Sequence, residues 1–283
     1  MKTGLVLEGG ALRAIYTSGV CDALLEGGIM PDYLVGVSAG IAYGVSYLSR
    51  QPRRNLQVLT TYASDRRYMG TRNLLDRNNR CYFGLKFAYD TIPNKLIPFD
   101  YDAFAAYSGQ VEAVVTNLNT GLAEYMPVPR RDRYSTLMQA TCAMPLMFPI
   151  FHIYNQPYLD GGIADSIPWQ RALKQGCDRV IVVLSHTRQY VRKVDTLMPL
   201  VRKKYKEYPA FIAAMERRAD IYNADRAKLF QAEKEGCVLV IAPNSTMGVS
   251  RTERNPEKLR LLWAKGYEDA MARLEEFRDY FSG

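Results

Sequence analysis

The first part of the chain repeats one local pattern, in which an apolar run ends in a turn of small residues and continues as a helix. Residues 3–8 (TGLVLE) predict a short buried strand, which leads into Gly9 and Gly10 and then into a helical pattern. Residues 33–37 predict a second buried strand, and another helical pattern begins at Ser38. Strands that alternate with helices point to a layered α/β fold, because helices cover the faces of the sheet.

Further strands are predicted in the rest of the chain. Residues 110–128 and residues 148–159 each have the pattern of a hairpin. Residues 180–184 (VIVVL) and 238–241 (VLVI) are continuous apolar runs, which are typical of strands covered by helices on both faces. We therefore expect the sheet to be mostly parallel.

Three later segments predict helices. Residues 131–144 have an amphipathic pattern, and residues 209–235 predict a long charged helix. The last helix is expected to begin with Asn255 as its cap and Pro256 in its first turn, where a proline costs no hydrogen bond.

Length and composition favour a single domain over residues 1–283. With 48% hydrophobic residues the chain can bury a substantial core, and two small domains fit its length less well. From about 51 to 104 the periodicity fades into a stretch rich in arginine, asparagine and aromatic residues, which we expect to form a cap or insertion over the sheet. From about residue 196 we expect a helical C-terminal extension.

The charge balance suggests some partners and disfavours others. The chain has 37 Lys and Arg residues against 29 Asp and Glu, a net charge of +8, which would attract phospholipid surfaces or nucleic acid. The basic residues are scattered in short groups, so a solvated face is favoured and no nucleic-acid partner is expected. Peripheral contact with an anionic membrane surface stays open, and the oligomeric state is not predicted.

The cysteine spacing and the short apolar runs indicate in which compartment the protein is expected. The five cysteines are far apart and include no CxxC pair, which favours a reducing cytoplasm over a disulfide framework or a zinc site. The apolar run at residues 4–7 is too short for the core of a signal peptide. No segment holds the roughly 18 apolar residues that a membrane-spanning helix needs. A cytoplasmic protein is expected.

The pentapeptide GVSAG, residues 36–40, matches the G-x-S-x-G pattern of a nucleophile elbow. In such an elbow a tight strand-to-helix turn exposes the serine oxygen, and Gly36 and Gly40 leave room where the two backbones approach. The helix N-terminus would favour the negative charge that develops during acyl transfer to Ser38. A structural turn with a serine near a helix cap would give the same letters.

A second turn of small residues, EGGALR, follows the first predicted strand. Consecutive glycines let backbone N–H groups face outward, and the nearby Arg13 adds a positive charge, so the segment could stabilise an oxyanion. The alternative is a nucleotide-binding turn, but the spacing is not G-x-G-x-x-G and no P-loop lysine follows.

The base that would activate Ser38 has three candidates. His152 lies within an apolar hairpin, which favours a structural role. His186 follows the VIVVL strand and could reach the carboxyl edge of the sheet, as a Ser-His-Asp triad would require. Asp160, followed by Gly161 and Gly162, could place a carboxylate directly against the serine, although a DGG segment is also a common turn.

Taken together, these segments resemble a known family. The runs LVLEGGALRAIYTSGVCDALLE, GVSAG and ATCAMPLMFPIFHIYNQPYLDGG look like the three signature blocks of bacterial patatin-like phospholipases, over roughly residues 4–170. The resemblance implies a three-layer α/β/α sandwich around a mostly parallel sheet. It also implies a Ser–Asp dyad without histidine that hydrolyses lipid or other carboxylic esters. No metal or other cofactor is expected.

The resemblance carries over to individual residues. Ser38 corresponds to the nucleophile, and Asp160 corresponds to the base that takes its proton and later activates water. Four residues correspond to the family's glycine-rich oxyanion block: Gly9, Gly10, Ala11 and Arg13. The chain departs from the pattern at Ala11, where a third glycine is usual, and the methyl group restricts positive φ.

Substrate preference is expected to come from residues 62–104 and from an apolar group that could line an acyl channel or belong to the core: Met144, Leu146, Met147 and Phe148. Two rival functions remain open. One is a non-catalytic binding protein with the same fold, and the other is an esterase that pairs Ser38 with His186. Calcium dependence is not expected, because the sequence has no EF-hand loop or comparable acidic cluster.

Overall fold

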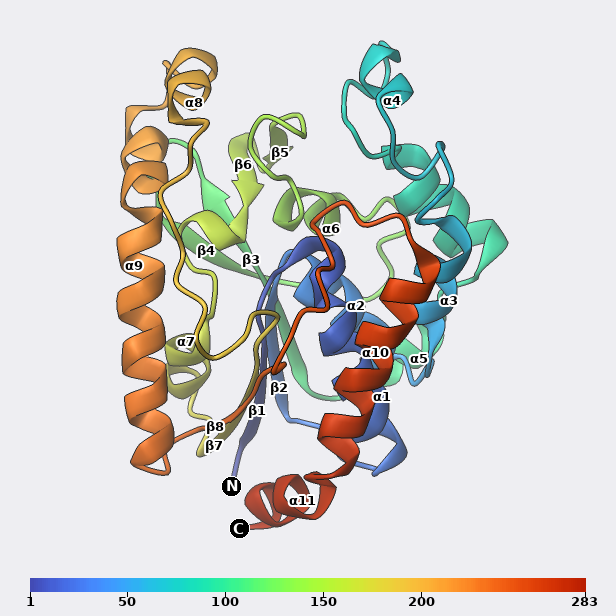
Figure 1. Cartoon of the computed structure of the whole chain (residues 1–283), viewed down its shortest axis with the longest axis vertical. Coiled ribbons are helices and arrows are strands. Elements are labelled where there is room, and N and C mark those ends of the chain that lie inside the picture. Colours follow the sequence, from blue (N-terminus) through green and yellow to red (C-terminus); the bar gives the residue numbers. More distant parts are fainter.

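A computed structural model describes all 283 residues and contains one eight-stranded sheet (Figure 1). The strands follow the order β5-β6-β3-β2-β1-β7-β8, and β4 pairs with β3 outside this path. Their bounds are β1 Thr3–Leu7, β2 Tyr33–Val37, β3 Gln110–Asn117, β4 Ala123–Pro127, β5 Phe151–Ile153, β6 Gln156–Asp160, β7 Arg179–Val183 and β8 Leu239–Ile241.

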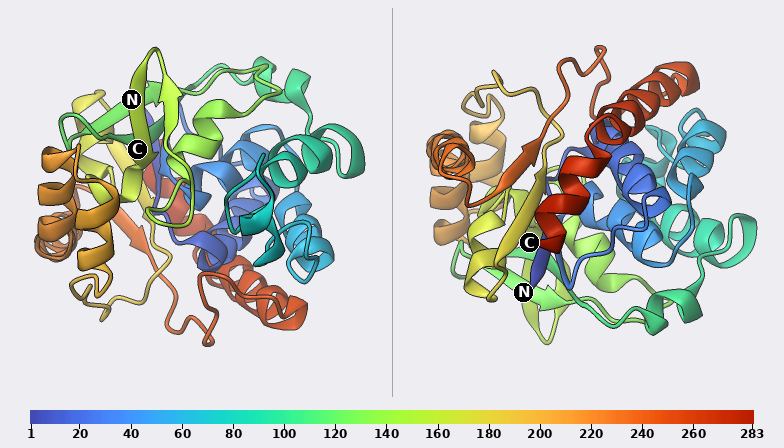
Figure 2. Two further views of the ribbon diagram at one scale, coloured as in Figure 1. Left: turned by 90° about the horizontal axis from the view of Figure 1, so that it is seen from above. Right: turned by 90° about the horizontal axis from the view of Figure 1, so that it is seen from below.

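Helices cover both faces of the sheet. Helices α1, α2 and α10 lie on one side, and α7 and α9 lie on the other, as the views from above and below also show (Figures 1 and 2). The three-layer α/β/α prediction is confirmed. The helices are η1 Ala11–Ala14, α1 Ile15–Glu26, α2 Ala39–Leu48, α3 Arg54–Tyr62, α4 Arg72–Leu75, η2 Phe87–Leu96, α5 Tyr101–Ala106, α6 Thr136–Thr141, η3 Gly161–Ile163, α7 Trp169–Lys174, α8 Met198–Lys204, α9 Pro209–Lys234, α10 Pro256–Met271 and α11 Leu274–Ser282.

Side-chain alternation along the central strands explains the two helical layers. In β1, Leu5 and Leu7 belong to the larger apolar core, whereas Val6 belongs to the smaller core on the opposite face. All five residues of β1 are buried and Leu5, Val6 and Leu7 follow one another, so apolar residues do not alternate with polar ones along the strand. This explains why continuous apolar runs predicted the central strands.

The sheet is parallel in its centre and antiparallel at one edge. Strands β3, β2, β1, β7 and β8 are mutually parallel, while β4 and β6 each pair antiparallel with β3, and β5 with β6. Both predicted hairpins are therefore present. The carboxyl ends of β1, β2 and β7 lie at the same edge, where ligand sites of parallel sheets usually form.

The predicted helix at 131–144 is shorter than expected, because only Thr136–Thr141 is α-helical. Asp132 accepts hydrogen bonds from the amides of Tyr134 and Thr136, a local turn that competes with the helix. Ser135 has a φ of 55°, which no α-helix permits. The amphipathic pattern therefore predicted a helix start several residues before the observed one.

Two segments were expected to lie outside the central layers. Residues 51–104 form α3, α4, η2 and the start of α5, on the same side of the sheet as α1 and α2 (Figure 1). After residue 196 the chain forms α8 and α9, adds β8 to the sheet, and returns as α10 against α1. Close approach of α10 to α1 depends on Gly266, since a Cβ there would lie 2.1 Å from the Tyr16 carbonyl oxygen.

Candidate active site

Ser38 occupies a sharp turn between β2 and α2. Its backbone has φ 53° and ψ −132°, a strained conformation for a residue with a side chain. A Cβ at Gly36 would lie 2.9 Å from Ile41, and a Cβ at Gly40 would lie 2.6 Å from the carbonyl oxygens of Leu7 and Glu8. Both glycines of the pentapeptide are therefore required for the close packing of this turn.

The register of the sheet brings Asp160 to Ser38 although 122 positions separate them in the chain. Val37 pairs with Val114 of β3, and the next β3 residue, Val115, pairs with Asp160 at the end of β6. Ser38 Oγ donates a hydrogen bond of 2.8 Å to Asp160 Oδ2, and both residues are buried. The structure thus brings together the two residues that the sequence singled out.

Two threonines hold this pair in place. Thr141 Oγ1 accepts a hydrogen bond from the Ser38 amide at 2.9 Å and donates to the Val114 carbonyl at 2.6 Å. Thr116 Oγ1 donates to the Asp160 carbonyl at 2.8 Å. Each hydroxyl has one proton, so the bond from Thr141 to Val114 leaves its oxygen free to accept from Ser38.

The surroundings of Asp160 favour a basic carboxylate. Burial raises the pKa of Asp160 above its ordinary range, and the charge of Arg218 and the hydrogen bond from Ser38 oppose that rise in part. The second oxygen, Oδ1, accepts from the Gly162 amide at 2.8 Å. Arg218 Nε in turn donates to the Gly162 carbonyl at 2.7 Å, so it fixes the loop that orients the carboxylate.

The turn at residues 9–11 lies beside Ser38. Ser185 Oγ donates to the Gly9 carbonyl at 2.7 Å, and a trans peptide then directs the Gly10 N–H away from Ser185. The amides of Gly9, Gly10 and Ala11 donate no hydrogen bond within the protein, so they are available to a ligand. Ala11 has a φ of 49°, so the turn keeps a left-handed conformation despite the methyl group.

Arg13 lies near this turn and lines a cavity that also contains Ser38, Gly9 and Gly10. Its Nε atom is buried and has no hydrogen-bond partner. Burial lowers the pKa of Arg13 from its ordinary value, and the charge of Arg251 adds to the effect. The guanidinium remains charged at neutral pH, because an arginine is protonated under all ordinary conditions.

Neither histidine is bonded to Ser38. His152 is exposed on β5. His186 is buried, stacks on Tyr190 with a centroid distance of 4.0 Å, and directs Nδ1 toward Glu8 Oε1 at 3.3 Å. Burial lowers the pKa of His186, so the ring is neutral at neutral pH and serves a buried polar network with Glu8 and Tyr222.

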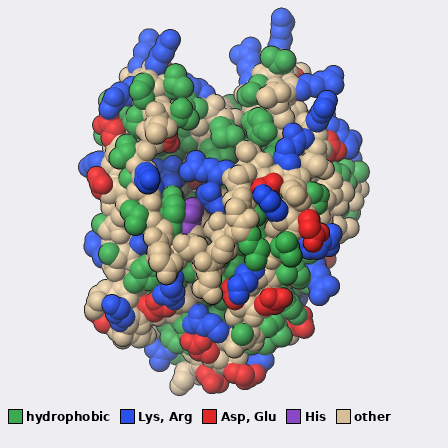
Figure 3. Space-filling model, in the orientation of Figure 1, with side chains coloured by type: hydrophobic (Ala, Val, Ile, Leu, Met, Phe, Trp, Pro, Cys, Tyr) green, Lys and Arg blue, Asp and Glu red, His purple; other side chains and the backbone are tan.

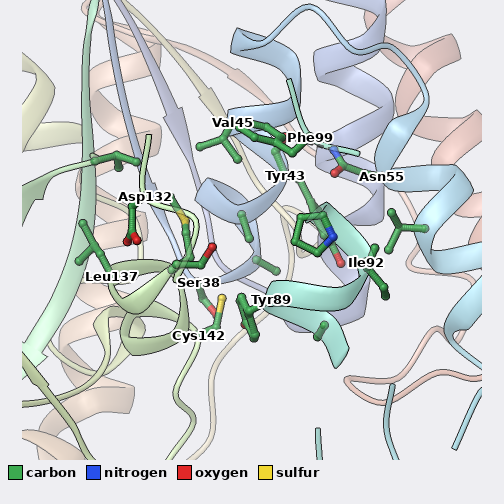
Figure 4. Close-up of a pocket in the computed structure, with 18 of the residues that line it drawn as sticks. Ser38, Tyr43, Val45, Asn55, Tyr89, Ile92, Phe99, Asp132, Leu137 and Cys142 are labelled. Carbon is green, nitrogen blue, oxygen red and sulfur yellow. Dashed lines mark hydrogen bonds between the residues drawn. The ribbon is translucent and has the colours of Figure 1, made fainter. Parts of the chain in front are cut away.

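An apolar cavity opens beside Ser38. Of its 29 lining residues 21 are hydrophobic, so it suits a hydrocarbon chain. Figure 4 shows Ser38 next to Cys142 on its wall, with Tyr89 and Ile92 of η2 facing the same space. Met144 and Phe148 line this cavity, while Leu146 and Met147 line the neighbouring cavity.

The sequence did not single out several residues that shape the site. Thr141 lies inside the ATCAMP block, but its role follows only from the register of β2 and β3. The arginines at 192, 218 and 251 come from distant segments and line the same cavity as Arg13.

No group of three or more His, Cys, Asp or Glu side chains is arranged to hold a metal ion. No helix is both long and apolar enough to span a membrane.

Comparison with known families gives two matches. The sequence model described as patatin-like phospholipase matches residues 5–173, which is more than half of the chain. A second model, described as a domain of unknown function (DUF6363), matches residues 208–282.

Individual relatives are more distant. A protein of Escherichia coli strain K12 described as uncharacterized protein YjjU is 25% identical over 229 residues, which are 71% of this chain and 60% of that protein. The chain therefore spans less than two thirds of this relative's length. The crystal structure of VipD from Legionella pneumophila aligns over 98% of this chain and 67% of that chain, with a TM-score of 0.43 and 14% identity.

Proposed function

Because the chain belongs to the patatin-like phospholipase family, we propose that it is a serine acyl hydrolase that uses Ser38 as nucleophile and Asp160 as base. The observation that carries the proposal is the hydrogen bond of 2.8 Å from Ser38 Oγ to Asp160 Oδ2. A nucleophile and a base within hydrogen-bond reach, with the base itself oriented, are the parts that covalent acyl transfer needs. Gly162 supplies that orientation through its amide.

The reaction would proceed in two halves. Ser38 Oγ attacks the ester carbonyl while Asp160 takes its proton, and the resulting oxyanion is held by the free amides of the 9–11 turn near Arg13. The proton passes to the leaving alcohol as the ester C–O bond breaks. Water then loses a proton to Asp160 and attacks the acyl-serine. As the bond between Ser38 Oγ and the acyl carbon breaks, that proton passes from Asp160 to Ser38 Oγ and the acid is released.

Lipid esters fit this site best as substrates. The apolar cavity beside Ser38 offers a place for an acyl chain, with aromatic side chains from the cap segment on its walls. The net charge of +8 favours peripheral contact with an anionic membrane surface, where such esters are found. Neither step of the proposed reaction requires a metal or other cofactor.

Labelling with a fluorophosphonate probe tests the proposal. We expect wild-type protein to be labelled at Ser38, and Ser38→Ala and Asp160→Asn to lose both labelling and ester hydrolysis while remaining folded by circular dichroism. His186→Ala is the matched control, because His186 lines the neighbouring cavity without bonding to Ser38. Activity retained in Asp160→Asn but lost in His186→Ala would move the base to His186. A folded wild-type protein that takes no label would favour the non-catalytic binding protein.

A further inference from the structure

A second cavity meets the apolar one at Ser38, and four arginines line it. Ala11, Ser38 and Met144 belong to the walls of both cavities. The arginines come from four separate parts of the chain: Arg13 in η1, Arg192 after β7, Arg218 on α9 and Arg251 after β8. Figure 3 shows basic side chains gathered in a hollow on this face, beside a histidine.

These arginines have no carboxylate partners. None of the four forms an ion pair within 4 Å, and the Nε atoms of Arg13 and Arg192 are buried without a hydrogen-bond partner. Only two carboxylates line the same cavity. Asp160 is engaged by Ser38 and Gly162, and Asp195 accepts from the Leu197 amide. The cavity therefore carries an excess of positive charge.

Two arginines outside the cavity are neutralised by carboxylates. Arg171 forms a bidentate pair with Glu112, and Arg188 forms one with Glu233. In the cavity, by contrast, burial and the neighbouring charge of Arg192 lower the pKa of Arg218 to about 10. Like charges brought together out of water are costly unless an anion joins them, because each disfavours the charged form of the others.

We propose that this arginine cavity binds the phosphate of an acidic glycerophospholipid while the acyl chain occupies the apolar cavity. The inference rests on the proposed function, because the ester to be cleaved would lie at Ser38, where the two cavities meet. Guanidinium groups match the geometry of phosphate oxygens and can bind them in pairs. A head group that carries an ammonium would place a further positive charge among four arginines, which repel it. The site therefore selects lipids whose head group has no ammonium.

Three single-chain substrates with the same acyl group test the selection: an acylglycerol phosphate, its choline ester and the uncharged monoacylglycerol. Each is presented at the same mole fraction in neutral detergent micelles. We expect kcat/KM for the acylglycerol phosphate to exceed both others by about tenfold or more, since a charge-assisted hydrogen bond contributes roughly that factor. Equal rates for the three lipids would overturn the inference and leave the hydrolase proposal standing.

Arginine variants locate the effect. Arg192→Gln and Arg251→Gln change side chains that form no hydrogen bond with Ser38 or Asp160, so any loss on monoacylglycerol should be smaller than the loss on the acylglycerol phosphate. Each variant should lower kcat/KM for the acylglycerol phosphate about tenfold. Arg217→Gln is the matched control, because Arg217 is exposed on the same helix as Arg218 and bonds only to the Ala213 carbonyl. Equal losses on all three substrates would overturn the inference.

Binding to Ser38→Ala separates this inference from the hydrolase proposal. The variant should bind the acylglycerol phosphate at least about tenfold more tightly than the choline ester, even if the wild type hydrolyses neither. Loss of that preference in the Ser38→Ala, Arg192→Gln double variant would support the arginine cavity. Inorganic phosphate distinguishes the source of the anion: we expect millimolar phosphate to compete weakly, and binding as tight as that of the lipid would overturn the lipid assignment.

Discussion

Replacing Thr141 with valine should weaken the elbow that presents Ser38 without altering either residue of the proposed dyad. Thr141 Oγ1 accepts from the Ser38 amide at 2.9 Å and donates to the Val114 carbonyl at 2.6 Å, and all three residues are buried. Valine has nearly the same volume as threonine but cannot make either bond. The buried amide of Ser38 would lose its acceptor at a position whose φ of 53° is already strained.

The expected size of the effect follows from these contacts. Leaving a buried amide without a partner costs about 1–3 kcal/mol in the free energy of unfolding. Since each 1.4 kcal/mol of lost transition-state positioning is about tenfold in rate, labelling of Ser38 should slow by roughly tenfold or more. Thr141→Ser keeps the hydroxyl and removes only a methyl group, so it should retain most of the stability and of the labelling rate.

Urea denaturation and the rate of fluorophosphonate labelling measure the two effects. Thr60→Val serves as a control, because the Thr60 hydroxyl bonds only to carbonyls of its own helix α3 and does not line the apolar cavity. Should Thr141→Val and Thr141→Ser show the same unfolding free energy and the same labelling rate, the hydroxyl of Thr141 does not position Ser38, and the reasoning is refuted.

Three further perturbations test other parts of the structure. Because burial raises the pKa of Asp160, its contribution to stability is complete below its unfolded pKa and is lost as pH rises through the folded value. In urea denaturation, the free energy of unfolding of Asp160→Asn should therefore rise relative to that of the wild type as pH rises. In the wild type, kcat/KM should fall on the acid side at a pH above the ordinary pKa of aspartate. A difference in unfolding free energy that does not change with pH would contradict this. Ala11→Gly should leave the free energy of unfolding unchanged or raise it by up to about 1 kcal/mol, because relief of the left-handed strain offsets the added freedom of the unfolded chain. A decrease of more than about 1 kcal/mol would be inconsistent with the φ of 49° at Ala11. Gly266→Ala should destabilise by about 1–3 kcal/mol in the same assay, because its Cβ would lie 2.1 Å from the Tyr16 carbonyl oxygen, and an unchanged midpoint would argue against that contact.

The parts of the site that the sequence predicted are those built from neighbouring residues. Gly36 and Gly40 flank Ser38 within one pentapeptide, and the strand before it and the helix after it are both visible in the apolar pattern. The pairing of Asp160 with Ser38 could not be predicted from neighbouring residues. Its DGG segment alone is equally consistent with a simple turn, and only the resemblance of the three sequence blocks to the family connected it to Ser38. In the structure that connection runs through β3, which pairs with both β2 and β6, strands that lie far from each other in the chain.

The arginine cavity shows why a cluster of charges from distant segments cannot be predicted from the sequence pattern. Arg217 and Arg218 are adjacent on α9, yet Arg217 is exposed and Arg218 turns inward to the Gly162 carbonyl. Helical spacing from Met215 to Tyr222 places Arg218 on the flank of the buried stripe, so periodicity limits the choice without deciding it. What decides it is how α9 is rotated against the sheet, and α9 packs into both apolar cores, through Met215 into the larger and through Tyr222 into the smaller. The same packing brings α9 to the loops after β7 and β8, which carry Arg192 and Arg251. Charges that look scattered along the chain therefore converge only once both faces of the sheet are covered.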